Sequence, residues 1–511
     1  METWFIILAS IFISVIFSLI YRLLLSNQKQ THSCLPPGPL TFPIVGNFLW
    51  LCKSFSELEQ VLRKLTAKFG PIITLRIGSR PAIFVSDRSL AHKALIQNGA
   101  VFADRPQALT TEKIDSSNQH TINTASYGPT WRVLRRNLTE KILHPSRVKA
   151  YSHARKWVLR ILLDSLKKSK FGEPVFVLEC FQYAMFCLLV LMCFGDKLEE
   201  KQIKEIEDAH RRLLLNYDRF DILDFCPVLT KIMFRKRWQE LYQLRQFQED
   251  VLIPLIRGRK KVKQERLSKT EEKNEYVLSY VDTLLDLQLL EEKRNLDEGE
   301  IVSLCSEFLN AGTDTTSTAL QWVMANLVKF PDVQEKLFME VKGIMKNGEE
   351  EVKEDDLQKL PYLKAVILEG LRRHPPAHFV LPHAVTEDVV LDGFLVPKDS
   401  TVNFMVAEMG WDSRVWKDPM AFKPERFING DEIGGEMFDI TGSREIKMMP
   451  FGVGRRICPG LNLALLHLEY FVANLVWSFK WIGDEVDLSE KQEFTMVMKN
   501  PLQVRLSPRF G

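Results

Sequence analysis

The chain has 511 residues, of which 26% are charged and 46% are hydrophobic. These fractions are those of an average globular protein, and they argue against a collagen-like, disordered or polytopic membrane protein. With 68 basic and 65 acidic residues the formal charge is +3, so the overall charge predicts no nucleic-acid partner. The 8 cysteines include no C-x-x-C pair and no Cys/His cluster, which predicts reduced thiols in a cytosol-facing protein.

The first predicted element is an uncharged apolar run from Trp4 to Tyr21. A helix of this length extends about 27 Å, close to the hydrocarbon thickness of a bilayer. A cleavable signal peptide would have positive charge before the run, but here Glu2 precedes it and Arg22 follows it. We expect an N-terminal single-span transmembrane helix within residues 1–25. The basic residues after the run place the rest of the chain in the cytosol.

A proline-rich segment comes after this predicted anchor. Pro36, Pro37 and Pro39 restrict the backbone and lack N–H donors, which is typical of a stiff spacer. We therefore expect a hinge over residues 26–50. No clear break follows, so residues 51–511 are expected to form one large catalytic body.

The patterning in this body predicts a mainly α fold with a small β part. Residues 71–87 predict a hairpin, because apolar and polar residues alternate on either side of a Gly-Ser-Arg-Pro turn. Apolar residues recur with the helical period over 154–166, 181–194, 238–256 and 301–330. The basic stretch 257–266 has no interleaved aromatic residues, and we interpret it as a solvated linker between two helices.

The most informative string is PFGVGRRICPG over residues 450–460. Its glycines allow the backbone to approach another group closely, and Pro459 suits the first position of a helix. Cys458 is then expected at a helix N-terminus, where unpaired N–H groups and the helix dipole favour the thiolate form that binds metals or acts as a nucleophile. Arg456 adds positive charge for an anionic group nearby.

Residues 311–316, AGTDTT, lie on a predicted helix. One face of this helix carries Phe308, Ala311, Gly312, Thr315 and Ala319. Small side chains on this face would let a flat ligand lie against the backbone. The alternative is close helix packing, with Thr315 bonded back to its own turn, and taken alone the motif favours this alternative.

Glu369 and Arg372 place opposite charges three residues apart on a helix that ends before Pro375. An exposed pair of this kind contributes little to stability. Apolar neighbours predict that this pair is buried, and a buried pair needs a further polar partner.

The spacing F-x-x-G-x-R-x-C-x-G, filled by Phe451, Gly454, Arg456, Cys458 and Gly460, resembles the haem-binding loop of the cytochrome P450 monooxygenases. The AGTDTT helix and the Glu-x-x-Arg pair also resemble family motifs and occur in the family's order. The resemblance covers nearly the whole chain and implies the cytochrome P450 fold. Residues 102–106, FADRP, resemble plant microsomal members, and residues 378–383 resemble family 89, subfamily A.

The resemblance implies a haem b cofactor whose iron is bound by Cys458. The implied cofactor-binding residues are Trp131, Arg135, Ala311, Gly312, His383, Phe451, Gly454, Arg456, Cys458 and Gly460. Trp131 and Arg135 look like the family pair that reaches a haem propionate. His383 occupies a position where members often have arginine, so its propionate contact should be weaker and pH-sensitive, with an ordinary core or surface histidine as the alternative.

Catalytic and structural roles follow from the same resemblance. Thr315 would hold dioxygen and relay protons, and Asp314 would feed them from solvent. Arg426 would join Glu369 and Arg372 in a structural network that braces the cysteine loop. Substrate contacts are implied for Phe308, Phe379, Val380 and Met496.

The implied function is a monooxygenase that inserts one oxygen atom from O2 into a lipophilic plant metabolite at the endoplasmic reticulum membrane. NADPH-cytochrome P450 reductase would supply the electrons, docking on Arg132, Arg136 and Arg455. An oxidised tetrapyrrole, a terpenoid or a phenylpropanoid are the open substrate alternatives. A reductase-independent haem-thiolate isomerase or dehydratase, and a non-enzymatic haem-binding membrane protein, remain the alternative functions.

Overall fold

The computed structural model describes residues 34–39, 55–77, 80–167, 173–195, 197–216, 219–224, 226–268, 278–346, 348–428 and 438–510. The predicted anchor over 1–25, most of the predicted hinge over 26–50, and two residues of the predicted hairpin turn, 78–79, lie outside these ranges. Among the described helices, α9 (Val177–Phe194) alone is long and apolar enough to cross a membrane, but 72% of it is buried inside the protein. Burial to this extent is typical of a helix in the hydrophobic core of a protein.

Helices make up most of the described structure. The α-helices are α3 (Phe55–Phe69), α4 (Arg88–His92), α5 (Thr110–Asp115), α6 (Pro129–Asn137), α7 (Pro145–Ala150), α8 (Ser152–Lys167), α9, α10 (Glu200–Leu215), α11 (Pro227–Met233), α12 (Arg235–Ser268), α13 (Tyr280–Leu284), α14 (Glu298–Lys329), α15 (Pro331–Ile344), α16 (Pro361–Arg373), α17 (Val406–Gly410) and α18 (Leu461–Ser478). Shorter 3-10 or π-helical turns are η1 (Lys93–Gln97), η2 (Leu138–Ile142), η4 (Asp221–Asp224), η5 (Glu354–Lys359), η6 (Pro424–Phe427) and η7 (Gly454–Arg456).

The strands are short. They are β1 (Ile72–Ile77), β2 (Arg80–Val85), β3 (Val175–Phe176), β4 (Gln288–Leu289), β5 (Arg294–Asn295), β6 (His383–Ala384), β7 (Val389–Leu391), β8 (Phe394–Val396), β9 (Thr401–Phe404), β10 (Phe479–Ile482), β11 (Glu490–Gln492), β12 (Met496–Met498) and β13 (Gln503–Pro508). The predicted fold class, mainly α with a small β part, is confirmed.

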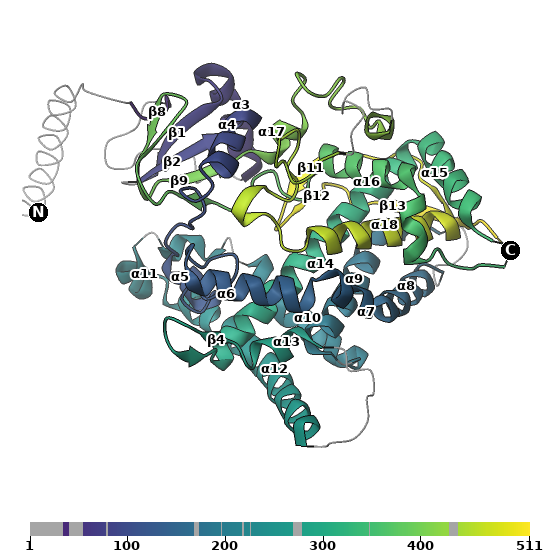
Figure 1. Cartoon of the computed structure of the whole chain (residues 1–511), viewed down its shortest axis with the longest axis horizontal. Coiled ribbons are helices and arrows are strands. Elements are labelled where there is room, and N and C mark those ends of the chain that lie inside the picture. Colours follow the sequence, from purple (N-terminus) through teal and green to yellow (C-terminus); the bar gives the residue numbers. More distant parts are fainter. Residues whose placement is uncertain are drawn as a thin grey trace, which may run out of the picture.

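Helix α14 is the central element of the helical part (Figure 1) and packs against α9, α12, α16 and α18. Its N-terminus is fixed by a capping box, in which the Asp297 carboxylate accepts from the N–H of Glu300 at 2.8 Å and the Glu300 carboxylate accepts from the N–H of Asp297 at 2.8 Å. Most of its side chains are buried from Glu300 onward, because neighbouring helices cover it on several faces. This central position makes α14 a rigid support for any side chains that it presents to a cavity.

The predicted hairpin is present and belongs to a small mixed sheet. Strands β1 and β2 pair antiparallel with Ile73 opposite Phe84, and the sheet order is β1-β2-β9-β6. Ile73, Leu75 and Phe84 form a separate core with Leu58 and Leu62 of α3. Figure 1 shows this sheet with α3 and α4 on one side of the molecule, and the larger helical part beside it.

The basic stretch 257–266 is helical, so its interpretation as a linker is wrong. It forms part of α12, which projects from the body in Figure 1. Lysine and arginine are good helix formers. The stretch is also held by a following segment, since Arg259 Nη2 donates to the Asp282 carboxylate at 2.7 Å and Lys263 Nζ donates to the Asp282 carbonyl at 2.6 Å.

Candidate active site

A cavity of about 390 Å³ lies against α14, between α6, α18 and the cysteine loop over 450–460. Its walls are mostly apolar. The predicted site residues that line it are Trp131, Arg135, Phe308, Ala311, Gly312, Thr315, Phe379, Val380, His383, Phe451, Arg456, Cys458 and Gly460. Gly454, Asp314, Met496 and the Glu369 network lie outside the lining.

The cysteine loop is closed by its own backbone. The N–H of Cys458 donates to the carbonyl of Phe451 at 2.9 Å, and the N–H of Ile457 donates to the carbonyl of Gly454 at 3.1 Å. Gly454 has a φ of 73°, and a Cβ at this position would collide with the carbonyl oxygen of Leu95. Glycine is therefore required at 454 for the loop to pack under η1 and present Cys458 to the cavity.

Cys458 lies just before a helix, not at its first turn. Helix α18 begins at Leu461, with Gly460 as its N-cap, whereas the sequence predicted a start at Pro459. Burial raises the pKa of the Cys458 thiol, and it outweighs the N–H of Gly460 and the charge of Arg135, which both lower it. The backbone N–H at the start of the helix thus acts in the predicted direction, and burial opposes it. A bound metal cation would supply the missing stabilisation of the thiolate.

Trp131 and Arg135, both on α6, contribute polar groups to the cavity wall. Arg135 Nη2 donates to the carbonyl of Ile457 at 2.6 Å, which ties α6 to the cysteine loop. The indole Nε1 of Trp131 is buried and has no hydrogen-bond acceptor among the described residues. Buried polar groups are rarely left unpaired. This orphan N–H next to the arginines fits a ligand that carries a carboxylate.

Two further arginines, Arg105 and Arg456, line the cavity, and of these the sequence predicts only Arg456 as part of the site. Arg456 donates to the carbonyls of Ala103, Ile122 and Ala125 at 2.7, 3.2 and 2.7 Å. Arg105 donates to the carbonyls of Asn123, Leu381 and Pro382 at 2.7, 3.0 and 2.9 Å. Burial lowers the pKa of Arg105 to about 9 and that of Arg456 to about 10, although the nearby carboxylates of Asp104 and Glu307 raise both.

His383 is a buried core histidine that also touches the cavity. Its Nδ1 lies 2.6 Å from the carbonyl of Phe102, and burial lowers its pKa to about 3. The neutral ring therefore donates from Nδ1 and keeps Nε2 as an acceptor, which does not suit a bond to a carboxylate. A bond to a carboxylate would need a proton on Nε2, so the expected pH-sensitive propionate contact stays a prediction.

We expect His383 to contribute to acid denaturation. Its folded pKa of about 3 lies below the ordinary value of 6.5, so the unfolded chain takes up this proton first and stability falls as pH drops below that ordinary value. The His383→Gln variant should lose less unfolding free energy on acidification than the wild type, by up to about 1.4 kcal/mol per pH unit. Urea unfolding across acidic pH measures the difference, with His153→Gln at an exposed histidine as the control. Parallel curves for wild type and His383→Gln would contradict it.

The AGTDTT segment divides between the cavity and the neighbouring helices. Thr315 lines the cavity, and its hydroxyl donates to the carbonyl of Ala311 at 2.6 Å. Ala311 faces the cavity as predicted. A Cβ at Gly312 would lie 2.6 Å from Leu189 on α9, so this glycine permits close helix packing, although the residue also borders the cavity.

Asp314 faces away from the cavity. It accepts a hydrogen bond from Gln182 of α9 at 3.2 Å, and Arg211 of α10 lies 3.7 Å from its carboxylate. Burial raises its pKa above the ordinary value, although Arg211 and Gln182 lower it. The Asp314 carboxyl therefore lies on a face of α14 that is turned away from the cavity and toward α10. In the sequence Asp314 is adjacent to Thr315, which does line the cavity.

The structure brings together the predicted charge network. Arg372 donates to both carboxylate oxygens of Glu369, at 2.7 and 2.9 Å, and the Nε of Arg426 lies 3.2 Å from the same carboxylate. Arg372 also donates to the carbonyls of Gly410 and Pro419 at 2.7 Å each. The Glu369 and Arg372 side chains are 0% exposed. The network links α16 to the segment around η6, outside the cavity.

Three of the four predicted substrate residues line the cavity: Phe308, Phe379 and Val380. Met496 does not. Its N–H donates to the carbonyl of Pro376 at 2.8 Å and its carbonyl accepts from Trp322 Nε1 at 2.7 Å, which fixes the strand so that Phe494 and Thr495 reach the cavity instead. Glu307 also lines the cavity and was missed, because the sequence does not show which face of α14 meets the loop before α6.

Comparisons with known proteins agree with this geometry. The family model described as cytochrome P450 matches residues 36–508. Over 521 residues the chain is 52% identical to cytochrome P450 89A9 of Arabidopsis thaliana, covering 99% of this chain and 98% of that protein. It is 32% identical to isoflavone 2'-hydroxylase of Medicago truncatula, with coverage of 98% and 96%.

Solved structures confirm the fold. A cyanobacterial CYP120A1 with bound retinoic acid superposes with a TM-score of 0.75 at 20% identity, covering 94% of this chain and all of that one. A zebrafish cytochrome P450 with progesterone gives a TM-score of 0.73 at 22% identity, covering 88% of this chain and 99% of that one. The cavity with its cysteine, the full-length family match and the hydroxylase relatives together show that the chain belongs to the cytochrome P450 family, as a monooxygenase of the plant type.

Proposed function

We propose that the protein is a haem-thiolate monooxygenase that inserts one oxygen atom from O2 into a lipophilic plant metabolite. Cys458 carries this proposal, because it offers a thiol that can bind a metal to a largely apolar cavity that also contains the alcohol of Thr315. Apolar walls with a few polar groups suit a lipophilic substrate.

Haem b is the proposed cofactor, and the residues present fit it. Cys458 would bind the iron through its thiolate, and the N–H of Trp131 with the guanidinium groups of Arg105, Arg135 and Arg456 would receive the two propionates. Bound in this way, the haem supplies the oxygen chemistry, with thiolate ligation favouring O–O bond cleavage. The protein holds the cofactor, excludes water and positions the substrate.

Thr315 and Asp314 are proposed to move protons. The Thr315 hydroxyl is at the cavity wall, and its bond to Ala311 fixes the oxygen position while leaving its lone pairs free to accept. Asp314 directly precedes Thr315 in the sequence, and the raised pKa of its carboxyl makes this group a more effective proton donor near neutral pH. Its contacts with Gln182 and Arg211 connect it to the outer helices.

Replacement of Thr315 by alanine is expected to uncouple NADPH use from product formation. Product per NADPH should fall by roughly a hundredfold, the range of a lost proton-transfer group, while hydrogen peroxide release rises. Microsomes that contain the protein and a reductase allow NADPH, peroxide and product to be measured together. Thr315→Ser keeps the hydroxyl and should restore coupling. Unchanged coupling in Thr315→Ala would contradict the role.

Electron supply is proposed to come from NADPH through the membrane-bound reductase. Arg132, Arg136 and Arg455 are all exposed on α6 and η7 next to the cysteine loop. Arg132 and Arg455 lie 5.2 and 5.5 Å from the ring centre of Tyr127, so they form one basic surface. Such a surface suits an acidic docking partner and would mainly set the association rate.

The proposed location is the endoplasmic reticulum membrane, with the division into anchor (1–25), hinge (26–50) and catalytic domain (51–511) predicted from sequence. Exposed apolar side chains on α11 support contact with lipid. Val228, Ile232 and Met233 are 75%, 77% and 71% exposed, which is unusual for large apolar residues unless they meet a membrane or a partner.

A further inference from the structure

The carboxylate of Glu307 is a feature of the cavity that haem binding does not explain. Glu307 lies on α14, eight residues before Thr315, and among the described residues that line the cavity it is the one carboxylic acid. The three cavity arginines of the described chain exceed the two propionates by one charge, and Glu307 balances this excess, since it stabilises the cationic forms of Arg105 and Arg456. Charge balance does not require contact with a ligand, whereas Glu307 lines the cavity.

Glu307 is held in one orientation by the loop that it faces. Its Oε2 accepts from the N–H of Ile122 at 2.9 Å and its Oε1 accepts from the N–H of Asn123 at 2.6 Å. The Thr121 hydroxyl also donates to it. A carboxylate offers about four acceptor positions, so at least one remains for a group inside the cavity.

The neighbouring cations do not use this remaining position. Arg105 and Arg456 each donate to three backbone carbonyls, and in the described chain neither forms an ion pair with Glu307. The next cavity residues along α14 are Phe308 and Ala311, which are apolar. Glu307 is therefore the charged acceptor available, among the described lining residues, to a hydrogen-bond donor at this end of the cavity.

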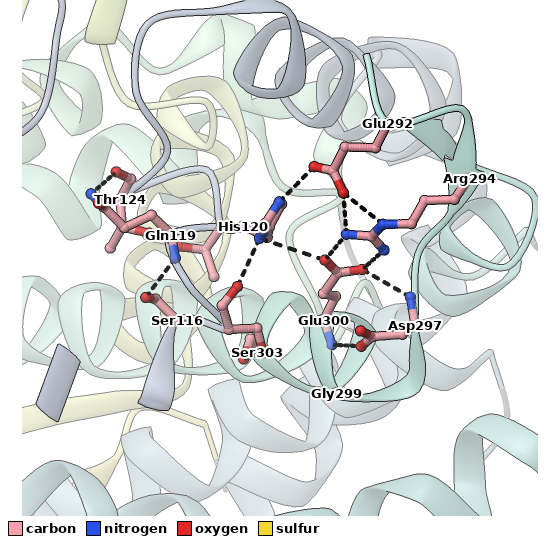
Figure 2. A network of polar contacts seen from close by, with 12 residues as sticks. Ser116, Gln119, His120, Thr124, Glu292, Arg294, Asp297, Gly299, Glu300 and Ser303 are labelled. Atoms are coloured by element: carbon pink, nitrogen blue, oxygen red, sulfur yellow. Dashed lines mark hydrogen bonds and ion pairs between the residues drawn. The ribbon is translucent and has the colours of Figure 1, made fainter. Parts of the chain in front are cut away.

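The loop does not depend on Glu307 alone for its attachment. Figure 2 shows a separate network around His120, whose Nε2 lies 3.0 Å from the Glu292 carboxylate, and Arg294 bridges Glu292 and Glu300. The Ser303 hydroxyl donates to the carbonyl of Asp115 at 2.5 Å, which ties the loop to α14 as well. Because these contacts already hold the loop, a purely structural role leaves the cavity-facing position of Glu307 unexplained.

We propose that Glu307 is the specificity-determining residue for substrates that carry an N–H or O–H donor on an otherwise lipophilic body. The proposal rests on the monooxygenase function above and names its substrate class. Eight residues of helix separate Glu307 from Thr315, which is about 12 Å along the axis. Glu307 would thus bind the donor group at one end of the substrate. Oxidation would take place at the other end, near Thr315 and about 12 Å from the donor.

The preference depends on the ionisation of Glu307. Burial raises the pKa of the Glu307 carboxyl to about 7, and the negative charge of Asp115 raises this pKa further. The backbone N–H groups of Asn123 and Ile122 act in the opposite direction and lower the pKa of this carboxyl. The cations Arg105 and Arg456 and the Tyr280 phenol are the other titratable groups that interact with it. As pH rises through this value the carboxylate forms, and the preference for a donor over an acceptor ligand increases.

A matched ligand pair tests the proposal: a long-chain 4-alkylphenol and its methyl ether, which differ in the donor. The full-length haem-loaded protein is titrated with each, and dissociation constants are obtained from the shift of the haem spectrum and from equilibrium dialysis. Wild type should bind the phenol about tenfold more tightly, as expected for a hydrogen bond to a charged group. Glu307→Gln should reduce this ratio to near one. The ratio in wild type should rise with pH around neutrality.

Glu298→Gln is the matched control, because Glu298 is an exposed acid on the same helix and pairs with Arg257 outside the cavity. It should keep the wild-type ratio. Hydrogen exchange of the Ile122 and Asn123 amides reports loop loosening, which would weaken both ligands equally and leave the ratio unchanged. An equal ratio in wild type and Glu307→Gln, or no preference in wild type, overturns the proposal.

This outcome is distinct from failure of the monooxygenase function. The ratio is a binding measurement and needs no turnover. Failure of the proposed function would appear as a protein that binds no haem, or as haem without thiolate ligation in the reduced carbon-monoxide spectrum. If haem and thiolate are present and the phenol preference is absent, the assignment of Glu307 is wrong while the proposed function stands.

Discussion

Replacing Cys458 with serine is expected to abolish the thiolate-type absorption band of the reduced carbon-monoxide complex and to lower turnover by at least about a thousandfold. The side chain at 458 is the one cysteine among the described residues that line the cavity. Serine preserves the size and the backbone bond from its N–H to Phe451. It does not provide the soft, electron-donating sulfur that favours O–O cleavage. The measurement is a difference spectrum with parallel product analysis.

The exposed Cys34 provides the control for this experiment. Cys34→Ser removes a thiol without touching the cavity, so the band and the turnover should remain at wild-type values. A Cys458→Ser protein that kept the wild-type band would show that another group binds the iron, and the assignment of the site would be wrong.

Neutralising Glu369 should cause the largest loss of stability. Its buried carboxylate is the shared partner of Arg372 and Arg426, so Glu369→Gln removes the charge that both buried guanidinium groups contact. Breaking a buried pair from one side costs about 3–5 kcal/mol. We expect the urea midpoint, followed by haem absorbance and by circular dichroism, to fall accordingly, and the yield of haem-loaded protein to fall with it.

The exposed pair of Glu200 and Lys204 on α10, with N and O 2.6 Å apart, is the control. Glu200→Gln should leave the midpoint unchanged, because water screens exposed charges. Since Glu369 lies outside the cavity, the surviving Glu369→Gln protein should bind ligands with wild-type dissociation constants. Weaker ligand binding at full stability would contradict a purely structural role.

Long helices and the first hairpin were predictable from the sequence because their periodicity is local. Helix α14 and strands β1 and β2 match the predicted ranges to within a few residues. The C-terminal third of α12 was not predicted, because its ion pairs with the segment around Asp282 are formed only in the folded chain. Strands of two to four residues such as β6 and β12 are too short to show an alternating pattern.

The candidate site was predictable where its residues lie close together in sequence. The cysteine loop and the AGTDTT helix are of this kind. Arg105 was identified as part of a family-like string but not as a cavity residue, because its bonds reach Leu381 and Pro382, which are 276 and 277 positions away. Gly312 borders the cavity as predicted, and the close approach of Leu189, which the sequence left open as an alternative, gives this glycine a packing role as well. Such contacts depend on tertiary packing.

The bonds from Arg456 and Arg105 to the 103–125 segment all end on backbone carbonyls. Carbonyl groups are the same at every residue, so these attachments are independent of the side chains that the segment carries. The two arginines therefore place no requirement on the side chains of this segment, whereas His120 and Thr121 are held through their own side chains. Substitutions at other positions of the segment are accordingly expected to alter the cavity wall without detaching it from Arg105 and Arg456.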